Sequence, residues 1–377
     1  MCPLKNVMPR HDRFGWRSYF HDSLPAVPSW FMSSLIESCG AGVFEHFRDC
    51  DPRLPVTRPM IKVVSGRPIV NLSLLNEVMR TWGLPIRLRA DTVADDKVGQ
   101  AFGANSGRLI RHLVPIFRFG RAQWFATRDA RRATSTLLQT GCRPFESFGA
   151  AVAAMQLVYV EKTWRMFNLT GCISLLQSLR RAITPEANGT HLRMLNTFME
   201  NDFDSVRAFI RSHPSVQRIL EVGEIPQELE FQDLWIVIMD RYGHRAVYED
   251  DLAQPRYAET PKALIAALMT PPRDRLRPRR TLLNRVLFPI EVQTRRLLAE
   301  REWFQHRTMV VFTHIRNELL RLADHAVLRG QLPTREALWN LDIDELRRLD
   351  QGWQPDEAFW KARAAEIDRL AQQQPSQ

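Results

Sequence analysis

Residues 231–257 read FQDLWIVIMDRYGHRAVYEDDLAQPRY, an apolar run followed directly by a densely charged stretch. The run from Phe231 to Met239 is typical of a buried helix, and Gly243 suits the position at which such a helix ends. Arg241–Tyr257, called the charged loop below, holds three arginines, a histidine, a glutamate and two aspartates. Binding chemistry concentrates on loops that rigid elements hold in place, so we take the charged loop as the candidate site.

The charged loop resembles a motif in the middle region of phosphoenolpyruvate synthase-like phosphotransferases, among them rifampicin phosphotransferase. The family pattern runs Tyr-Gly-His-Arg, then a glutamate and a second acidic residue, and ends in Pro-Arg before an aromatic residue. Here these places are held by Tyr242–Arg245, Glu249, Asp251 and Pro255–Tyr257. The family usually has small or turn-forming residues where this chain has Ala246–Tyr248, which removes the φ freedom of a glycine.

The resemblance extends over residues 57–85 and 231–346. A strand-turn-strand segment with Gly66 and Arg67 is similar to one in the family. A long helix with Arg301-Glu302 and Arg307 resembles the family's long helix, although Ala337 stands where the family usually has an aspartate.

The sequence predicts a mainly α fold with helical lobes, one long C-terminal helix and a small β-hairpin near the N-terminus. We expect residues 1–56 to be irregular, residues 57–72 to form the hairpin, and Ser73 to cap a short helix that Gly83 ends. Apolar periodicity predicts helices from about residue 106 onward. Their expected ranges are 145–167, 172–183, 191–200, 203–212, 215–222, and 289–329 with Pro289 in the first turn.

The predicted domain organisation is an N-terminal segment with the hairpin (1–85), a helical acceptor-binding region (86–370) and a disordered tail (371–377). The formal net charge of +10 is compatible with nucleic acid, an acidic membrane surface or anionic small molecules. No run approaches the roughly 20 apolar residues of a membrane span, and the N-terminus lacks the apolar core of a signal peptide. We therefore expect a cytoplasmic protein without membrane contact. The five scattered cysteines indicate neither a disulfide framework nor a zinc site, and no metal site is predicted.

The resemblance implies transfer of a phosphoryl group from ATP through a histidine to an acceptor. The chain has neither a Gly-x-x-x-x-Gly-Lys-Ser/Thr run nor the family's Thr-Ser-His-x-Ala carrier motif. The chain is thus expected to bind no cofactor directly, and ATP with Mg²⁺ is implied for a partner. Separate ATP-grasp and phosphohistidine proteins and a small-molecule acceptor are the expected partners.

Phosphoryl transfer needs cations around the moving oxygens and a carboxylate that takes the acceptor's proton. The candidate catalytic residues are Glu249, Asp251 and His244. The candidate phosphate- and substrate-binding residues are Arg245, Arg256, Arg301 and Arg307. The same residue types also form ion-pair networks, and such a network could instead pin the loop to the long helix.

Three functions stay open at this point. The first is a stand-alone acceptor-binding subunit of such a phosphotransferase, which leaves its own enzymatic activity uncertain. The second is a non-catalytic ligand-binding or scaffold relative. The third is a basic helical protein that binds nucleic acid through the arginine-rich stretch 273–280.

Overall fold

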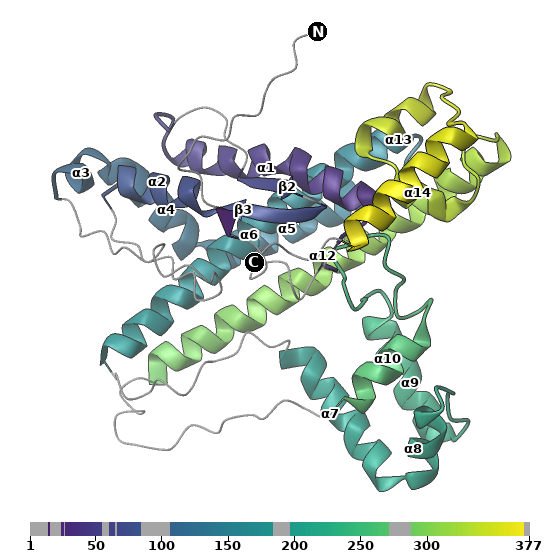
Figure 1. Ribbon diagram of the computed structural model, residues 1–377. Coiled ribbons are helices and arrows are strands. Elements are labelled where there is room, and N and C mark those ends of the chain that lie inside the picture. Colours follow the sequence, from purple (N-terminus) through teal and green to yellow (C-terminus); the bar gives the residue numbers. More distant parts are fainter. Residues whose placement is uncertain are drawn as a thin grey trace. The chain divides into compact units, whose positions relative to one another are not determined.

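The computed structural model describes residues 14–15, 24–25, 27–54, 60–64, 66–83, 106–183, 197–270 and 288–372. Over these ranges the chain is mainly helical with one small antiparallel sheet, which confirms the predicted fold class (Figure 1). The chain divides into two compact units. Unit 1 is Met1–Ala122, Pro144–Trp164 and Ile315–Gln377, and unit 2 is Gln123–Arg143 and Arg165–His314. The domain boundaries predicted after residues 85 and 370 stay predictions.

Unit 1 contains the sheet and the helices near both ends of the chain. Its elements are β1 (Phe14–Gly15), α1 (Trp30–Cys50), β2 (Ile61–Val64), β3 (Arg67–Asn71), α2 (Leu72–Thr81), α3 (Ser106–Arg111), most of α4 (Leu113–Trp124), the first part of α6 (Phe148–Ile183), the end of α12 (Phe288–Leu328), the 3-10 helix η3 (Arg335–Asn340), α13 (Ile343–Asp350) and α14 (Glu357–Gln372). The last two residues of α14 fall in the predicted tail, and the rest of that tail lies outside the described residues.

The predicted hairpin is confirmed. Strands β2 and β3 pair antiparallel with Val64 opposite Arg67, and Gly66 between them has a φ of +71°, which glycine adopts without strain. The short strand β1 adds to the other side of β3, giving the order β1-β3-β2. The cap predicted at Ser73 is wrong, because Asn71 accepts a hydrogen bond from the Leu74 amide (2.9 Å) and thereby caps α2.

The prediction that residues 1–56 are irregular is wrong for α1. Ser29 caps this helix by accepting a hydrogen bond from the Met32 amide (3.2 Å). Its buried residues recur every three or four positions, the period of one helical face. At Gly40 a Cβ atom would lie 2.5 Å from the carbonyl oxygen of Ile61, so the backbone of α1 packs directly against β2.

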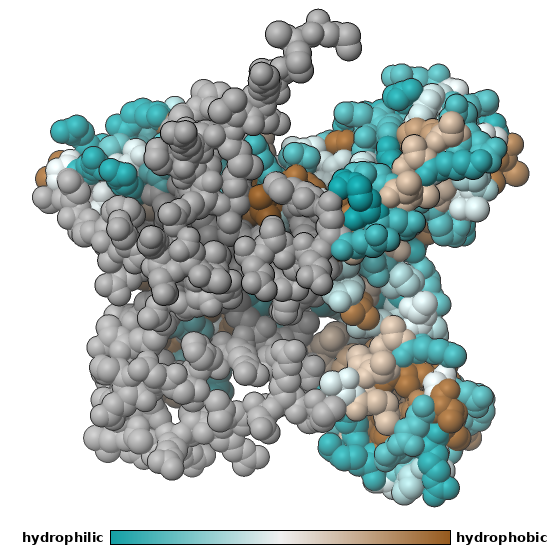
Figure 2. Space-filling model, in the orientation of Figure 1, coloured by the Kyte–Doolittle hydropathy of each residue, from teal (hydrophilic) through white to brown (hydrophobic). Residues whose placement is uncertain are grey.

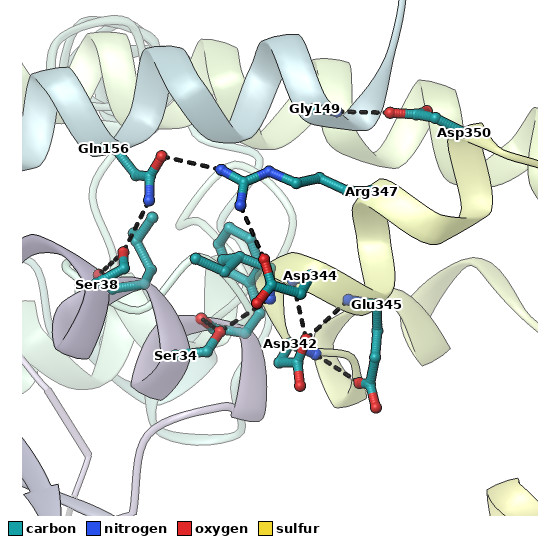
Figure 3. A network of polar contacts seen from close by, with 12 residues as sticks. Ser34, Ser38, Gly149, Gln156, Asp342, Asp344, Glu345, Arg347 and Asp350 are labelled. Carbon is teal, nitrogen blue, oxygen red and sulfur yellow. Dashed lines mark hydrogen bonds and ion pairs between the residues drawn. The ribbon is translucent and has the colours of Figure 1, made fainter. Parts of the chain in front are cut away.

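Polar side chains connect α1, α6 and α13 within unit 1 (Figure 3). Gln156 of α6 donates to the hydroxyl of Ser38 (2.9 Å) and accepts from Arg347 of α13 (3.3 Å). The carboxylate of Asp350 accepts hydrogen bonds from the two amides of Phe148–Gly149, at 3.0 and 2.7 Å. A side chain distant in sequence therefore satisfies amide groups that the first turn of α6 leaves without helical partners.

Unit 2 contains the remaining helices of the described ranges. They are α5 (Ala126–Gly141), the second part of α6, α7 (Thr197–Ser212), α8 (Pro214–Glu221), α9 (Leu229–Tyr242), α10 (Pro261–Met269) and the first part of α12. Helices α7 to α10 share one apolar core, and we call them the α7–α10 lobe (Figure 1). This core consists of Phe203, Val206, Ile210, Val216, Leu220, Phe231, Trp235, Ile238, Tyr242, Tyr257, Leu264, Ile265 and Leu268.

Two predicted helix breaks in unit 2 are wrong. Helix α6 runs through residues 168–171, where the sequence indicates a break, and α7 runs through residues 201–202. A Cβ atom at Gly171 would lie 2.7 Å from the side-chain nitrogen of Gln123, and the thiol of Cys172 donates to the Gln123 carbonyl (2.8 Å). Gly171 therefore marks a close contact between α6 and the end of α4. The part of the predicted helix 191–200 before residue 197 lies outside the described residues.

The predicted long helix is confirmed, since α12 spans Phe288–Leu328 and Gly330 follows it with a φ of +70°. At 1.5 Å per residue it is about 60 Å long. None of the helices in the described ranges combines the length and the apolar character that a bilayer crossing requires.

Candidate functional site

The charged loop begins where α9 ends. Helix α9 ends at Tyr242 and Gly243 is its C-cap, as the sequence indicates, with a right-handed φ of −57°. Glycine is required there, since a Cβ atom would collide with the carbonyl oxygen of Met239 and lie 3.4 Å from the Cβ of Ala258. Residue 258 lies this close to Gly243 because the two ends of the loop are joined by a backbone hydrogen bond between them.

Two backbone hydrogen bonds close the base of the loop. The amide of Tyr257 donates to the carbonyl of Arg245 (2.8 Å), and the amide of Ala258 donates to the carbonyl of Gly243 (2.9 Å). The hydroxyl of Thr260 donates to the carbonyl of Arg256 (3.1 Å) just before α10 begins. The loop is thus held at both of its ends by its own backbone.

The carboxylate of Glu249 lies between a loop arginine and a glutamine of the long helix. Arg245 donates through Nε to one carboxylate oxygen, and Gln305 of α12 donates to the other at 2.7 Å. Arg245 and Glu249 are only 5% and 9% exposed. The charge-assisted pair lies within the loop, and the hydrogen bond from Gln305 connects it to α12.

Arg256 and Asp251 bind the backbone of the loop itself. Arg256, 1% exposed, donates through Nη1 to the carbonyl of Glu249 (3.0 Å). Asp251 is fully buried and accepts a hydrogen bond from the Ala253 amide (3.0 Å). These two candidate residues therefore shape the turn that carries Glu249.

Two histidines meet next to this centre. The ring of His244 lies edge-on against the ring of His306 from α12, with 4.6 Å between the centroids, and the hydroxyl of Thr313 donates to the His244 carbonyl (2.9 Å). Burial, followed by the nearby His306 and Arg245, lowers the pKa of His244 to about 3. Burial and Arg245 lower the pKa of His306 to about 4. Both imidazoles are therefore neutral at physiological pH.

The two candidate arginines on α12 differ in exposure. Arg301 is half-buried, and this burial lowers the pKa of its guanidinium from its ordinary value. Arg307 is exposed and lies over the ring of Trp303, 5.4 Å from its centroid, while its charge helps to lower the pKa of His306.

The structure brings His244, Arg245, Glu249 and Arg256 together, while Asp251 supports the turn between them. The sequence did not indicate Gln305, His306 and Thr313, which lie 56 or more residues beyond their loop partners. Their positions along α12 are one, seven and eight residues apart, but such spacing occurs on any long helix and carries no signal for a site. Within the described residues, no group of three His, Cys, Asp or Glu side chains is arranged to hold a metal ion.

Residues 161–282 match the family described as the rifampicin phosphotransferase fourth domain. This segment contains the α7–α10 lobe and the whole charged loop, and it is less than half of the chain. No curated protein matches the chain. The matched segment is thus similar to a phosphotransferase domain, which confirms the resemblance where the two overlap, over residues 231–282.

Proposed function

We propose that this chain supplies the acceptor-binding region of a phosphoenolpyruvate synthase-like phosphotransferase, where a small molecule is phosphorylated from a phosphohistidine. ATP-grasp and phosphohistidine partners would bind ATP with Mg²⁺ and deliver the phosphoryl group. The match of residues 161–282 supports the phosphotransferase relationship. The observation that carries the proposal is the buried carboxylate of Glu249. Arg245 and Gln305 donate hydrogen bonds to it, and the charged loop that contains it lies within the matched residues.

The arrangement suits transfer to a hydroxyl group. The acceptor oxygen attacks phosphorus, the bond from phosphorus to the histidine nitrogen breaks, and the acceptor's proton passes to the carboxylate of Glu249. Arg245 and Arg256 are already fixed in place, so they would stabilise phosphoryl oxygens without the cost of reorganisation. A histidine with a pKa of about 3 contributes a neutral hydrogen-bonding group, and His244 would position the acceptor rather than carry charge.

A specific observation favours the second function, a non-catalytic ligand-binding or scaffold relative. Arg245 and Glu249 neutralise each other, and Gln305 extends their pairing to α12. Such a network stabilises the loop with or without chemistry. The arginine-rich stretch behind the nucleic-acid hypothesis lies outside the described residues.

The test combines the chain with ATP, Mg²⁺ and the ATP-grasp and phosphohistidine domains of a related phosphotransferase, and follows labelled phosphate into a panel of hydroxyl compounds. Glu249→Gln keeps the shape of the side chain and removes the base, so transfer should fall by roughly 10²–10⁴. Asp240→Asn, an exposed carboxylate on α9, is the matched control and should leave transfer unchanged.

Two outcomes contradict the proposal. Full transfer by the Glu249→Gln variant would remove this residue from the chemistry. A correctly folded wild-type chain that supports no transfer, although the same domains phosphorylate their own acceptor region, would favour the scaffold function.

A further inference from the structure

Helices α3 and α4 expose an apolar face. Ile110, Leu113, Val114 and Phe117 are 69%, 58%, 60% and 72% exposed. Their spacing of three, four and seven residues places them on one side of the helical path, which the bond from the Ile116 amide to the His112 carbonyl (2.9 Å) continues between α3 and α4. Isolated exposed apolar residues are ordinary, but four on one face indicate a surface that is covered in use.

The opposite face of α4 is packed in unit 1. Pro115 and Phe119 are buried, and the ring of Phe119 lies 5.9 Å from that of Phe47 and 5.4 Å from that of Trp82. One side of α4 is therefore packed in unit 1, and the other side exposes Leu113, Val114 and Phe117. A surface helix normally has the reverse pattern, with charged residues facing solvent.

The charged residues of α3 and α4 themselves are all arginines. No aspartate or glutamate occurs in the sequence between Asp96 and Asp129. Within the described part of that segment, Arg111, Arg118 and Arg121 are exposed. We call Ile110, Leu113, Val114, Phe117 and these three arginines the basic apolar surface.

Helix α9 exposes apolar residues beside acidic ones, although Arg241 at its end is exposed as well. Helix α9 exposes Ile236 and Val237, at 61% and 54%, together with Asp233 and Asp240. Figure 2 shows apolar atoms beside hydrophilic ones on the α7–α10 lobe. The basic apolar surface is thus a distinct feature of α3 and α4.

We propose that the basic apolar surface binds the face of an anionic lipid bilayer. A helix with aromatic and aliphatic residues on one face and arginines beside them is typical of interfacial membrane binding. The apolar side chains enter the boundary between headgroups and acyl chains, while Arg111, Arg118 and Arg121 pair with lipid phosphates. A protruding helix face can enter a bilayer without a matching groove, and the anionic headgroups attract all three arginines. A protein partner would need both a complementary groove and acidic side chains placed opposite the arginines. This inference does not depend on the proposed transferase function, and it is an alternative to the expectation of no membrane contact, which stays a prediction.

The test measures co-sedimentation of the full chain with vesicles. One preparation is phosphatidylcholine alone, and the other contains equal parts of phosphatidylcholine and phosphatidylglycerol. Binding should occur only to the second and should weaken as salt is added. Phe117→Ser should lower the partition constant roughly tenfold or more, because the apolar side chain no longer leaves water. Arg118→Glu should lower it by at least about fivefold.

The matched controls are Ile236→Ser, an apolar residue of α9 that is 61% exposed, and Arg218→Glu, an exposed arginine of α8. Both should bind vesicles as the wild type does, and circular dichroism checks that every variant is folded. Equal sedimentation with both vesicle types, or unchanged binding by Phe117→Ser, would overturn the proposal. Concentration-dependent self-association that Phe117→Ser abolishes, without vesicle binding, would also overturn it and assign the surface to a second copy of the chain.

Discussion

Removing the carboxylate of Glu249 tests how strongly the charged loop is held on α12. In Glu249→Ala, the guanidinium of Arg245 stays buried without its partner, and the amide of Gln305 loses its acceptor. Breaking one side of a buried ion pair costs on the order of 3–5 kcal/mol, mostly because the remaining charge is desolvated and uncompensated. The loss therefore exceeds the effect of any exposed ion pair in the chain.

The expected change in melting temperature follows from this free energy. A folding unit of 150–250 residues loses about 2–4 °C for each kcal/mol, so Glu249→Ala should melt roughly 6–20 °C below the wild type. Glu249→Gln keeps an oxygen for Gln305 and should lose less. Asp240→Ala, the exposed control, should change stability by no more than about 0.5 kcal/mol. Thermal melts followed by circular dichroism measure all three variants.

A double-mutant cycle separates the pair from its surroundings. Arg245→Ala together with Glu249→Ala leaves neither charge buried, so the double variant should be more stable than the sum of the single losses implies, with a coupling of about 0.5–3 kcal/mol. Additive losses, or a Glu249→Ala melt within about 1 °C of the wild type, would refute the buried pair as the element that holds the loop.

Three further changes probe other contacts. Gly40→Ala brings a Cβ within 2.5 Å of the Ile61 carbonyl oxygen and should cost about 1–3 kcal/mol in chemical unfolding. Gly120→Ala meets no atom within 4 Å in the exposed middle of α4, and should instead gain up to about 1 kcal/mol. Asp350→Ala removes the cap of α6, and should cost about 1 kcal/mol and speed hydrogen exchange in its first turn. His244 has its pKa lowered from 6.5 to about 3, so its contribution to stability is fully present above pH 6.5. That contribution is lost as the pH falls toward 3, because the unfolded chain takes up a proton first; His244→Gln should flatten the loss in unfolding measured across this range.

Each of these predictions has a contrary result. Equal stability of Gly40→Ala and Gly120→Ala would contradict the tight packing of α1 on β2. Unchanged exchange in Asp350→Ala would mean that the cap does not hold the helix start. A pH profile that is identical for the wild type and His244→Gln would contradict the burial of that imidazole.

The residues near one another in sequence predicted a large part of the fold. The hairpin around Gly66 follows from alternation and a glycine turn, and α12 follows from apolar periodicity bounded by Pro289 and Gly330. Helix α1 was missed although its buried residues have helical spacing, because two glycines lower its intrinsic helix propensity. The contact between Gly40 and β2, which leaves no room for a side chain, explains why a glycine occupies position 40.

The sequence also indicated the charged loop and its family resemblance, since both depend on residues within one short segment. The tertiary structure alone decided which charges are paired. Glu249 meets Gln305 and His244 meets His306 because α12 passes beside a loop that lies more than fifty residues earlier in the chain. The composition of the loop suits an open anion site as well as a closed ion pair. Burial distinguishes the two, since a carboxylate withdrawn from water needs fixed partners, and those partners come from wherever the fold brings another helix alongside.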